Sequence, residues 1–82
     1  MIFDKKAYFE CLIPSSNRRA FYHLVAGRDL FGPLLIRYWG RIGTKGQPKL
    51  RVRFSSQEKM MNEFDRVTKK RLAHQYKLIQ KS

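Results

Sequence analysis

Residues 37–47 read RYWGRIGTKGQ and carry the pattern that best indicates the fold. Side chains of a strand alternate between the two faces of its sheet. One alternate set is apolar and is expected to face the core: Ile36, Tyr38, Gly40 and Ile42. The other set is cationic with an indole at its centre: Arg37, Trp39 and Arg41. The segment therefore predicts a strand with one apolar face and one basic face.

The segment from Lys49 to Phe54 repeats this alternation and predicts the next strand. Its apolar residues are Leu50, Val52 and Phe54, and its basic residues are Lys49, Arg51 and Arg53. A register that buries both apolar sets places both basic sets on the same face. We expect the two strands to be neighbours and to present one shared basic face.

The loop between these strands, residues 43–48, carries Lys45 between two glycines. Glycines leave the backbone amides accessible, so the loop can hold a phosphate oxygen or can simply reverse the chain. Turn statistics favour the simple reversal.

Aromatic and branched residues predict two earlier strands, and short connections favour an antiparallel meander. The segment Ser55-Ser56-Gln57-Glu58 matches a capping box with Ser55 as the N-cap of a helix. An apolar stripe at helical spacing follows: Met60, Met61, Phe64, Val67 and Leu72. The remaining predictions are strands at Ala7 to Pro14, Ala20 to Ala26 and Leu34 to Gly43, a loop at Gly27 to Pro33, a tail packed through Tyr76, Leu78 and Ile79, and fraying of residues 80–82.

The predicted fold class is therefore α+β. We expect an antiparallel sheet of four strands, or slightly more, with one amphipathic helix packed across its apolar face. A chain of 82 residues has room for one small core, so a single domain covering residues 1–82 is expected.

The net charge of +12 indicates a polyanionic partner. Hydrophobic residues make up 43% of the chain, which is ample for a packed interior and argues against a disordered basic tail. The amino terminus offers neither an amphipathic basic helix nor a lipidation signal, and no stretch approaches the length of an apolar spanning segment, so no membrane partner is expected. We expect a soluble, cytoplasmic, bacterial protein. If it binds DNA, we expect it to be associated with the nucleoid.

Catalysis, cofactors and metal binding have little support in the sequence. Cys11 is the only cysteine, and we expect it to be a buried strand residue. His23 and His74 lie far apart and form no metal-ligating frame, so each is expected to be structural or solvated. No carboxylate pair or nucleophile-base pair appears, and we predict a protein that is not an enzyme.

Trp39-Gly40-Arg41, with its flanking residues, resembles the signature of the WGR domain, a module of poly(ADP-ribose) polymerases and of small bacterial proteins. Phe21-Tyr22, the turn at residues 43–47, Phe54-Ser55-Ser56 before the helix and Tyr76 follow the order of features in that family. The resemblance covers about residues 8–79. It implies an antiparallel sheet with one helix, and contact with DNA at a strand break through Trp39 and Arg41. The chain contains no ADP-ribosyltransferase region, so a role in relaying DNA binding to a catalytic domain is absent or acts on another protein.

The functional hypothesis is a DNA-binding module for ends, nicks or strand junctions with little base specificity. Trp39 is expected to stack on a sugar or terminal base, arginines to pair with phosphates, and lysines to act as flexible charges. The alternatives are a protein-interaction module that docks an acidic partner or regulates a separate enzyme, an RNA ligand, and a partly buried structural role for Trp39. The candidate DNA-binding residues are Trp39, Arg41, Gly40, Arg37, Lys45, Lys49, Arg51 and Arg53.

Overall fold

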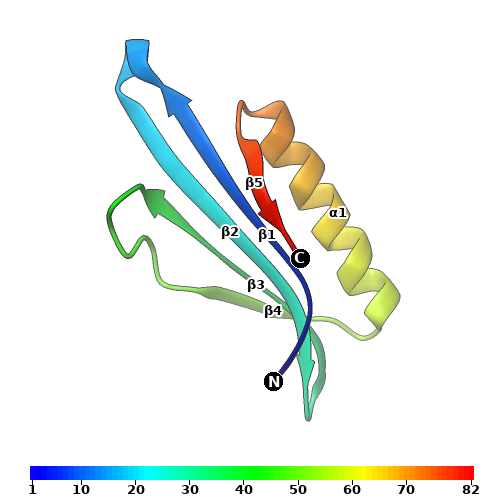
Figure 1. The fold of residues 1–82 in the computed structure, drawn as a ribbon. Coiled ribbons are helices and arrows are strands. Elements are labelled where there is room, and N and C mark those ends of the chain that lie inside the picture. The colour runs from blue at the N-terminus through cyan, green and yellow to red at the C-terminus, as the bar shows by residue number, and fades with distance from the viewer.

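The structure, a computed structural model that describes all 82 residues, is a twisted five-stranded antiparallel sheet with one helix along one face (Figure 1). The strand order is β4-β3-β2-β1-β5, so the first four strands form the predicted meander. The α+β fold class is confirmed. The elements are β1 (Ile2–Ile13), a short 3-10 helix (Pro14–Ser16), β2 (Arg18–Asp29), β3 (Gly32–Arg41), β4 (Leu50–Arg53), α1 (Gln57–Ala73) and β5 (Lys77–Lys81).

The first two strands are longer than predicted, and the expected loop at Gly27 to Pro33 is wrong. β2 and β3 meet at a two-residue turn, with Asp29 paired to Gly32. Gly27 remains inside β2 because the backbone of β1 passes close to it: a Cβ atom there would lie 2.6 Å from the carbonyl oxygen of Ile2. This glycine marks a close approach of the backbones of β1 and β2, and not a loop.

The tail forms a fifth strand. β5, red in Figure 1, pairs with β1 and covers its outer edge. The predicted fraying of residues 80–82 is wrong, because Ser82 and Lys6 exchange two backbone hydrogen bonds, with N···O distances of 2.9 and 2.6 Å. Pairing satisfies the backbone groups that β1 would otherwise expose. Tyr76, just before β5, is buried as predicted, whereas Leu78 and Ile79 stay exposed.

The helix begins one residue later than the capping box suggested. Ser56 is the N-cap, and its hydroxyl accepts a hydrogen bond from the amide of Lys59 at 3.2 Å. Glu58 therefore lies in the first turn, where its charge complements the positive end of the helix dipole. Met60, Phe64 and Val67 are buried as predicted, and Met61 is partly buried against the core. Leu72 was expected to pack as well but is 47% exposed.

The helix covers the face of the sheet opposite to the predicted one. The main core joins α1 to Leu24 and Leu35, whereas Val25, Leu34 and Ile36 form a separate small cluster. The face of β3 under the helix is therefore the face of Leu35, Arg37 and Trp39. The prediction failed because residues 34–36 are apolar on both faces, so alternation cannot tell which face the helix covers.

The shared basic face is also wrong. Residues directly opposite each other in an antiparallel pair point to the same face. Arg37 is opposite Leu50, and Ile36 is opposite Arg51. The basic residues of β3 and those of β4 therefore lie on opposite faces of the sheet. Register was the missing information, since each strand does alternate as predicted.

Candidate nucleic-acid interface

Trp39 lies near the end of β3, with its ring against Tyr22 of β2. The two residues are directly opposite each other, their ring centroids are 5.5 Å apart, and their planes differ by 7°. Trp39 is 37% exposed while Tyr22 is buried. The indole is therefore held in position by a stacked neighbour and still offers surface to a ligand.

A third ring, Tyr76, and two arginines contact the stacked pair or its neighbour. Tyr76 packs edge-on against Tyr22 with centroids 6.2 Å apart. The guanidinium carbon of Arg71 lies 4.8 Å from the centre of the Tyr22 ring, and that of Arg18 lies 5.7 Å from the centre of Tyr76. The contact of Arg71 joins the end of α1 to β2, and the contact of Arg18 joins β2 to the segment before β5.

An open groove of about 640 Å³ runs past the indole. Three arginines line it, Arg18 and Arg19 from the start of β2 and Arg41 from the end of β3. All three are exposed, and the Nη1 atom of Arg41 makes only a long hydrogen bond, 3.4 Å, to the carbonyl oxygen of Asn17. None of the residues that line the groove carries a carboxylate. The groove can accept phosphate oxygens through planar arginine donors, with the indole beside them for stacking.

The glycine-containing loop folds back over Gly40. Gly46 has a φ of +78°, and a Cβ atom on Gly40 would lie 2.5 Å from the Cα atom of Gly46. The amide of Gln47 donates to the carbonyl oxygen of Trp39 at 2.7 Å, and the amide of Gly46 donates to the hydroxyl of Thr44 at 3.2 Å. These two amides are used within the protein, which supports the turn rather than a phosphate cradle.

The eight candidate residues do not all lie together. The structure brings Trp39, Gly40 and Arg41 together at the groove, with Lys45 exposed on the adjoining loop. Arg37 is half-buried, and its Nε atom is buried without a hydrogen-bond partner. The other three belong to the opposite face: Lys49, Arg51 and Arg53.

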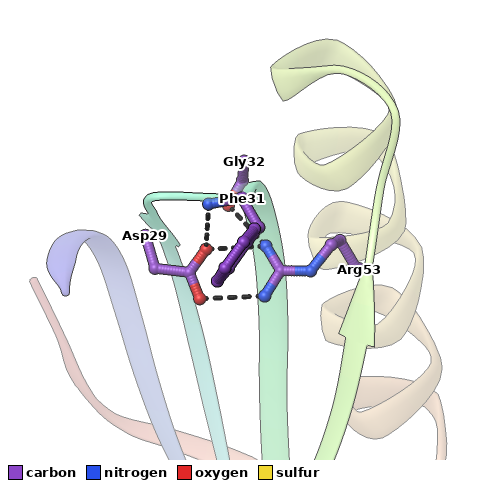
Figure 2. Close-up of polar contacts among 4 residues, drawn as sticks. All are labelled: Asp29, Phe31, Gly32 and Arg53. Carbon is purple, nitrogen blue, oxygen red and sulfur yellow. Dashed lines mark hydrogen bonds and ion pairs between the residues drawn. The ribbon is translucent and has the colours of Figure 1, made fainter.

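The side chain of Arg53 binds the turn between β2 and β3. Its guanidinium forms a bidentate ion pair with Asp29, and Nη1 also donates to the carbonyl oxygen of Gly32 at 3.1 Å (Figure 2). These contacts hold the turn between β2 and β3. Both terminal nitrogens of Arg53 are occupied by these intramolecular contacts, so Arg53 is not proposed as a ligand contact.

Sequence reasoning missed five residues of this region: Arg18, Arg19, Tyr22, Arg71 and Tyr76. Arg18 and Arg19 fall between the strands predicted at Ala7 to Pro14 and Ala20 to Ala26. They begin β2 instead, in the register that puts Ala20 opposite Arg41. Pairing the predicted second and third strands would have brought both arginines to the end that carries Trp39.

Cys11 occupies the buried strand position that was predicted for it, and the two histidines lie in separate elements. Cys11 is buried in β1, His23 lies within β2, and His74 is the C-cap of α1. No group of three or more His, Cys, Asp or Glu side chains is arranged to hold a metal ion. The single helix lacks the length and apolar character needed to cross a bilayer.

Comparisons with known proteins give two findings. The family model of the WGR domain matches residues 5–82. An uncharacterized protein of Sinorhizobium fredii, y4dW, is 49% identical over 43 residues, which cover 51% of this chain and 21% of that protein. The similarity thus spans about a fifth of the relative's length. No solved structure matches the chain.

Proposed function

Because the chain belongs to the WGR domain family, we propose that it is a non-enzymatic DNA-binding module for DNA ends, nicks or strand junctions. WGR domains are nucleic-acid-binding modules in poly(ADP-ribose) polymerases, and the family consists of binding modules rather than catalysts. The proposed contact residues are Trp39, Gly40 and Arg41, with Lys45 on the loop that follows β3 and Arg18 added from β2.

The observation that carries the proposal is the partly exposed indole of Trp39 with Arg18 and Arg41 on the same face of the sheet, in a groove without a carboxylate. Arginine–phosphate contacts position a nucleic-acid backbone without reading its sequence. Stacking on an indole requires an accessible ring or sugar, and inside an intact duplex the bases are already stacked on one another. Ends and nicks expose such surfaces, so the combination favours them over continuous duplex.

The test is a binding comparison at several salt concentrations, by fluorescence anisotropy. The ligands are a nicked duplex, a blunt duplex, a single strand, and a continuous duplex whose ends are closed by hairpin loops. We expect the nicked and blunt duplexes to bind more tightly than the closed duplex. If roughly four to six phosphates are neutralised, log affinity falls with log salt at a slope of about −4 to −5. A flat salt titration, or equal affinity for the closed and nicked duplexes, would contradict the proposal.

Two variants with equal charge loss sharpen this test. Arg41→Ala removes a groove cation, whereas Lys59→Ala removes an exposed cation from the first turns of α1. Of these two variants, Arg41→Ala should reduce the preference for the nicked duplex, and Lys59→Ala should not. Trp39→Ala should reduce it too, but this change also removes the ring stacked on Tyr22, so its melting temperature must be measured in parallel.

A second candidate function is a protein-interaction module that docks a partner chain or regulates a separate enzyme. The turn between β2 and β3 favours it, because Leu30 and Phe31 are 98% and 80% exposed. Two adjacent exposed apolar side chains, at a turn that the Asp29–Arg53 ion pair holds, offer apolar contact area to a partner chain. A protein partner held by them should remain bound at salt concentrations that release DNA, and Leu30→Ser with Phe31→Ser should abolish its binding.

A further inference from the structure

The face of the sheet away from α1 carries a row of three rings. Tyr8, His23 and Tyr38 are directly opposite one another on β1, β2 and β3. Their centroids are 5.6 Å apart from Tyr8 to His23 and 4.9 Å apart from His23 to Tyr38. All three residues are half-buried, so part of each remains accessible. The main core with α1 includes none of them.

A second row beside the rings is cationic at both ends. Lys6, Val25, Ile36 and Arg51 are successive partners across β1 to β4. Lys49, which precedes β4, reaches the same face and places its Nζ atom 5.4 Å from the centre of the Tyr38 ring. The face therefore combines a line of rings with three positive charges.

The hollow between the two rows has no acidic residue. Its volume is about 300 Å³, and Lys6, Lys49, Arg51, His23 and Tyr38 are among the residues that line it. The nearby carboxylate of Glu10 lies outside the hollow and accepts a hydrogen bond from the hydroxyl of Tyr8 at 2.9 Å. Burial first, and then the charges of Lys6 and Lys49, lower the pKa of His23. The positive potential thus reaches the ring row itself.

From these rows we infer that the face opposite α1 binds single-stranded nucleic acid, with bases on the Tyr8-His23-Tyr38 row and phosphates on Lys6, Lys49 and Arg51. The charges require an anion, and the rings require a ligand with accessible flat faces. An unpaired strand offers both, while a duplex keeps its bases stacked inside. This inference does not rest on the groove at Trp39, which belongs to the face that α1 covers.

Lys6 and Lys49 are placed to exchange an aromatic ring for a phosphate when a nucleic-acid strand binds. Lys49 lies over Tyr38, and the Nζ atom of Lys6 lies 4.4 Å from the centre of the Phe3 ring. Lysine side chains are flexible point charges, so each ammonium can leave its ring for a phosphate. A stacked base then takes the place of Lys49 over Tyr38.

The test compares two single strands that carry equal numbers of phosphates. One is an oligothymidylate of about twelve nucleotides, and the other is an abasic strand of the same length. We expect the protein to bind the oligothymidylate at least about fivefold more tightly, because only that strand can stack on rings. Tyr38→Leu should remove most of this preference, and Tyr38→Phe, which keeps the ring, should retain it. Lys49→Ala with Arg51→Ala, at exposed positions, should weaken binding of both strands.

A variant with Trp39→Leu and Arg41→Ala separates this inference from the proposed function. The variant should lose its preference for the nicked duplex and keep its preference for oligothymidylate over the abasic strand. Equal binding of the two strands by the unaltered protein would overturn the inference. So would loss of the preference in the Trp39→Leu, Arg41→Ala variant, or displacement of the oligothymidylate by an oligoglutamate of equal charge with equal affinity.

Discussion

Asp29 and Arg53 form a bidentate ion pair between the end of β2 and the end of β4, across the width of β3. The two N···O distances are 2.7 Å, from Nη1 to Oδ1, and 2.8 Å, from Nη2 to Oδ2. The Oδ1 atom of Asp29 also accepts a hydrogen bond from the amide of Phe31 at 2.9 Å, and the guanidinium carbon of Arg53 lies 5.6 Å from the centre of the Phe31 ring (Figure 2). This pair fixes the turn that presents Leu30 and Phe31.

The first prediction concerns the acid stability of this pair. The hydrogen bonds from Arg53, and then the one from the Phe31 amide, lower the pKa of Asp29 to about 2. Because the pKa in the folded state lies below the unfolded value, the pair stabilises the fold above about pH 4, and this contribution is lost as pH falls through about 2. Asp29→Asn should therefore show a smaller fall in melting temperature between pH 6 and pH 2 than the unaltered protein. Identical falls in the two proteins would show that the pair does not couple to folding.

The second prediction compares the two serines before the helix. Ser56 caps the first turn, so Ser56→Ala should destabilise the protein by about 1 kcal/mol, which lowers the melting temperature by roughly 4 to 8 °C. Ser55 is exposed and is not the cap, so Ser55→Ala should change stability by less than about 0.5 kcal/mol. Thermal unfolding followed by circular dichroism measures both. The reverse order would assign the cap to Ser55.

The third prediction separates the two glycines of the loop at residues 43–48. Both have positive φ, but a Cβ atom on Gly46 would lie 2.6 Å from the carbonyl oxygen of Trp39, whereas one on Gly43 would meet no atom within 4 Å. Gly43→Ala should cost about 1 kcal/mol from backbone strain alone. Gly46→Ala adds a steric clash with the backbone of β3 and should cost roughly 2 kcal/mol or more. Denaturant unfolding measures the difference. Equal losses would mean that the loop does not pack on Gly40.

Much of the fold was predictable because local signals agree with it. Alternation, turn residues and helical spacing located four strands and the helix. The fifth strand was missed because residues 77–81 lack a strong strand pattern and are ordered by pairing with β1. The length of β2 was missed because Gly27 looks like a loop residue in sequence, while its function is to admit the backbone of Ile2.

The candidate site was only partly predictable, because alternation defines faces within one strand but not between strands. Trp39 and Arg41 were found together because they share a strand. Arg51 was grouped with them because it alternates with the apolar residues of its own strand, but the register puts it opposite Ile36 on the other face. Tyr22 and Arg18 were not selected because their proximity to the indole depends on pairing between β2 and β3 and on the position of Tyr76. Register is a tertiary property that a single strand does not encode.

The last prediction tests the difference between two arginines of β3. Arg37 lies between Leu24 and Leu50 in the register, and its buried Nε atom has no hydrogen-bond partner. A buried donor without a partner costs about 1 to 3 kcal/mol. Arg37→Leu removes this donor and matches its neighbours, so the variant should melt at an equal or higher temperature. Its affinity for a nicked duplex should keep the same salt dependence.

Arg41→Leu should behave in the opposite way. Arg41 is exposed at the groove, so its replacement should change stability by less than about 0.5 kcal/mol. If Arg41 contacts one phosphate, the slope of log affinity against log salt should become shallower by about 1, and binding should weaken. Anisotropy titrations of both variants at several salt concentrations measure this contrast. A shallower slope for Arg37→Leu with an unchanged one for Arg41→Leu would place the bound backbone along the middle of β3 and not at its end.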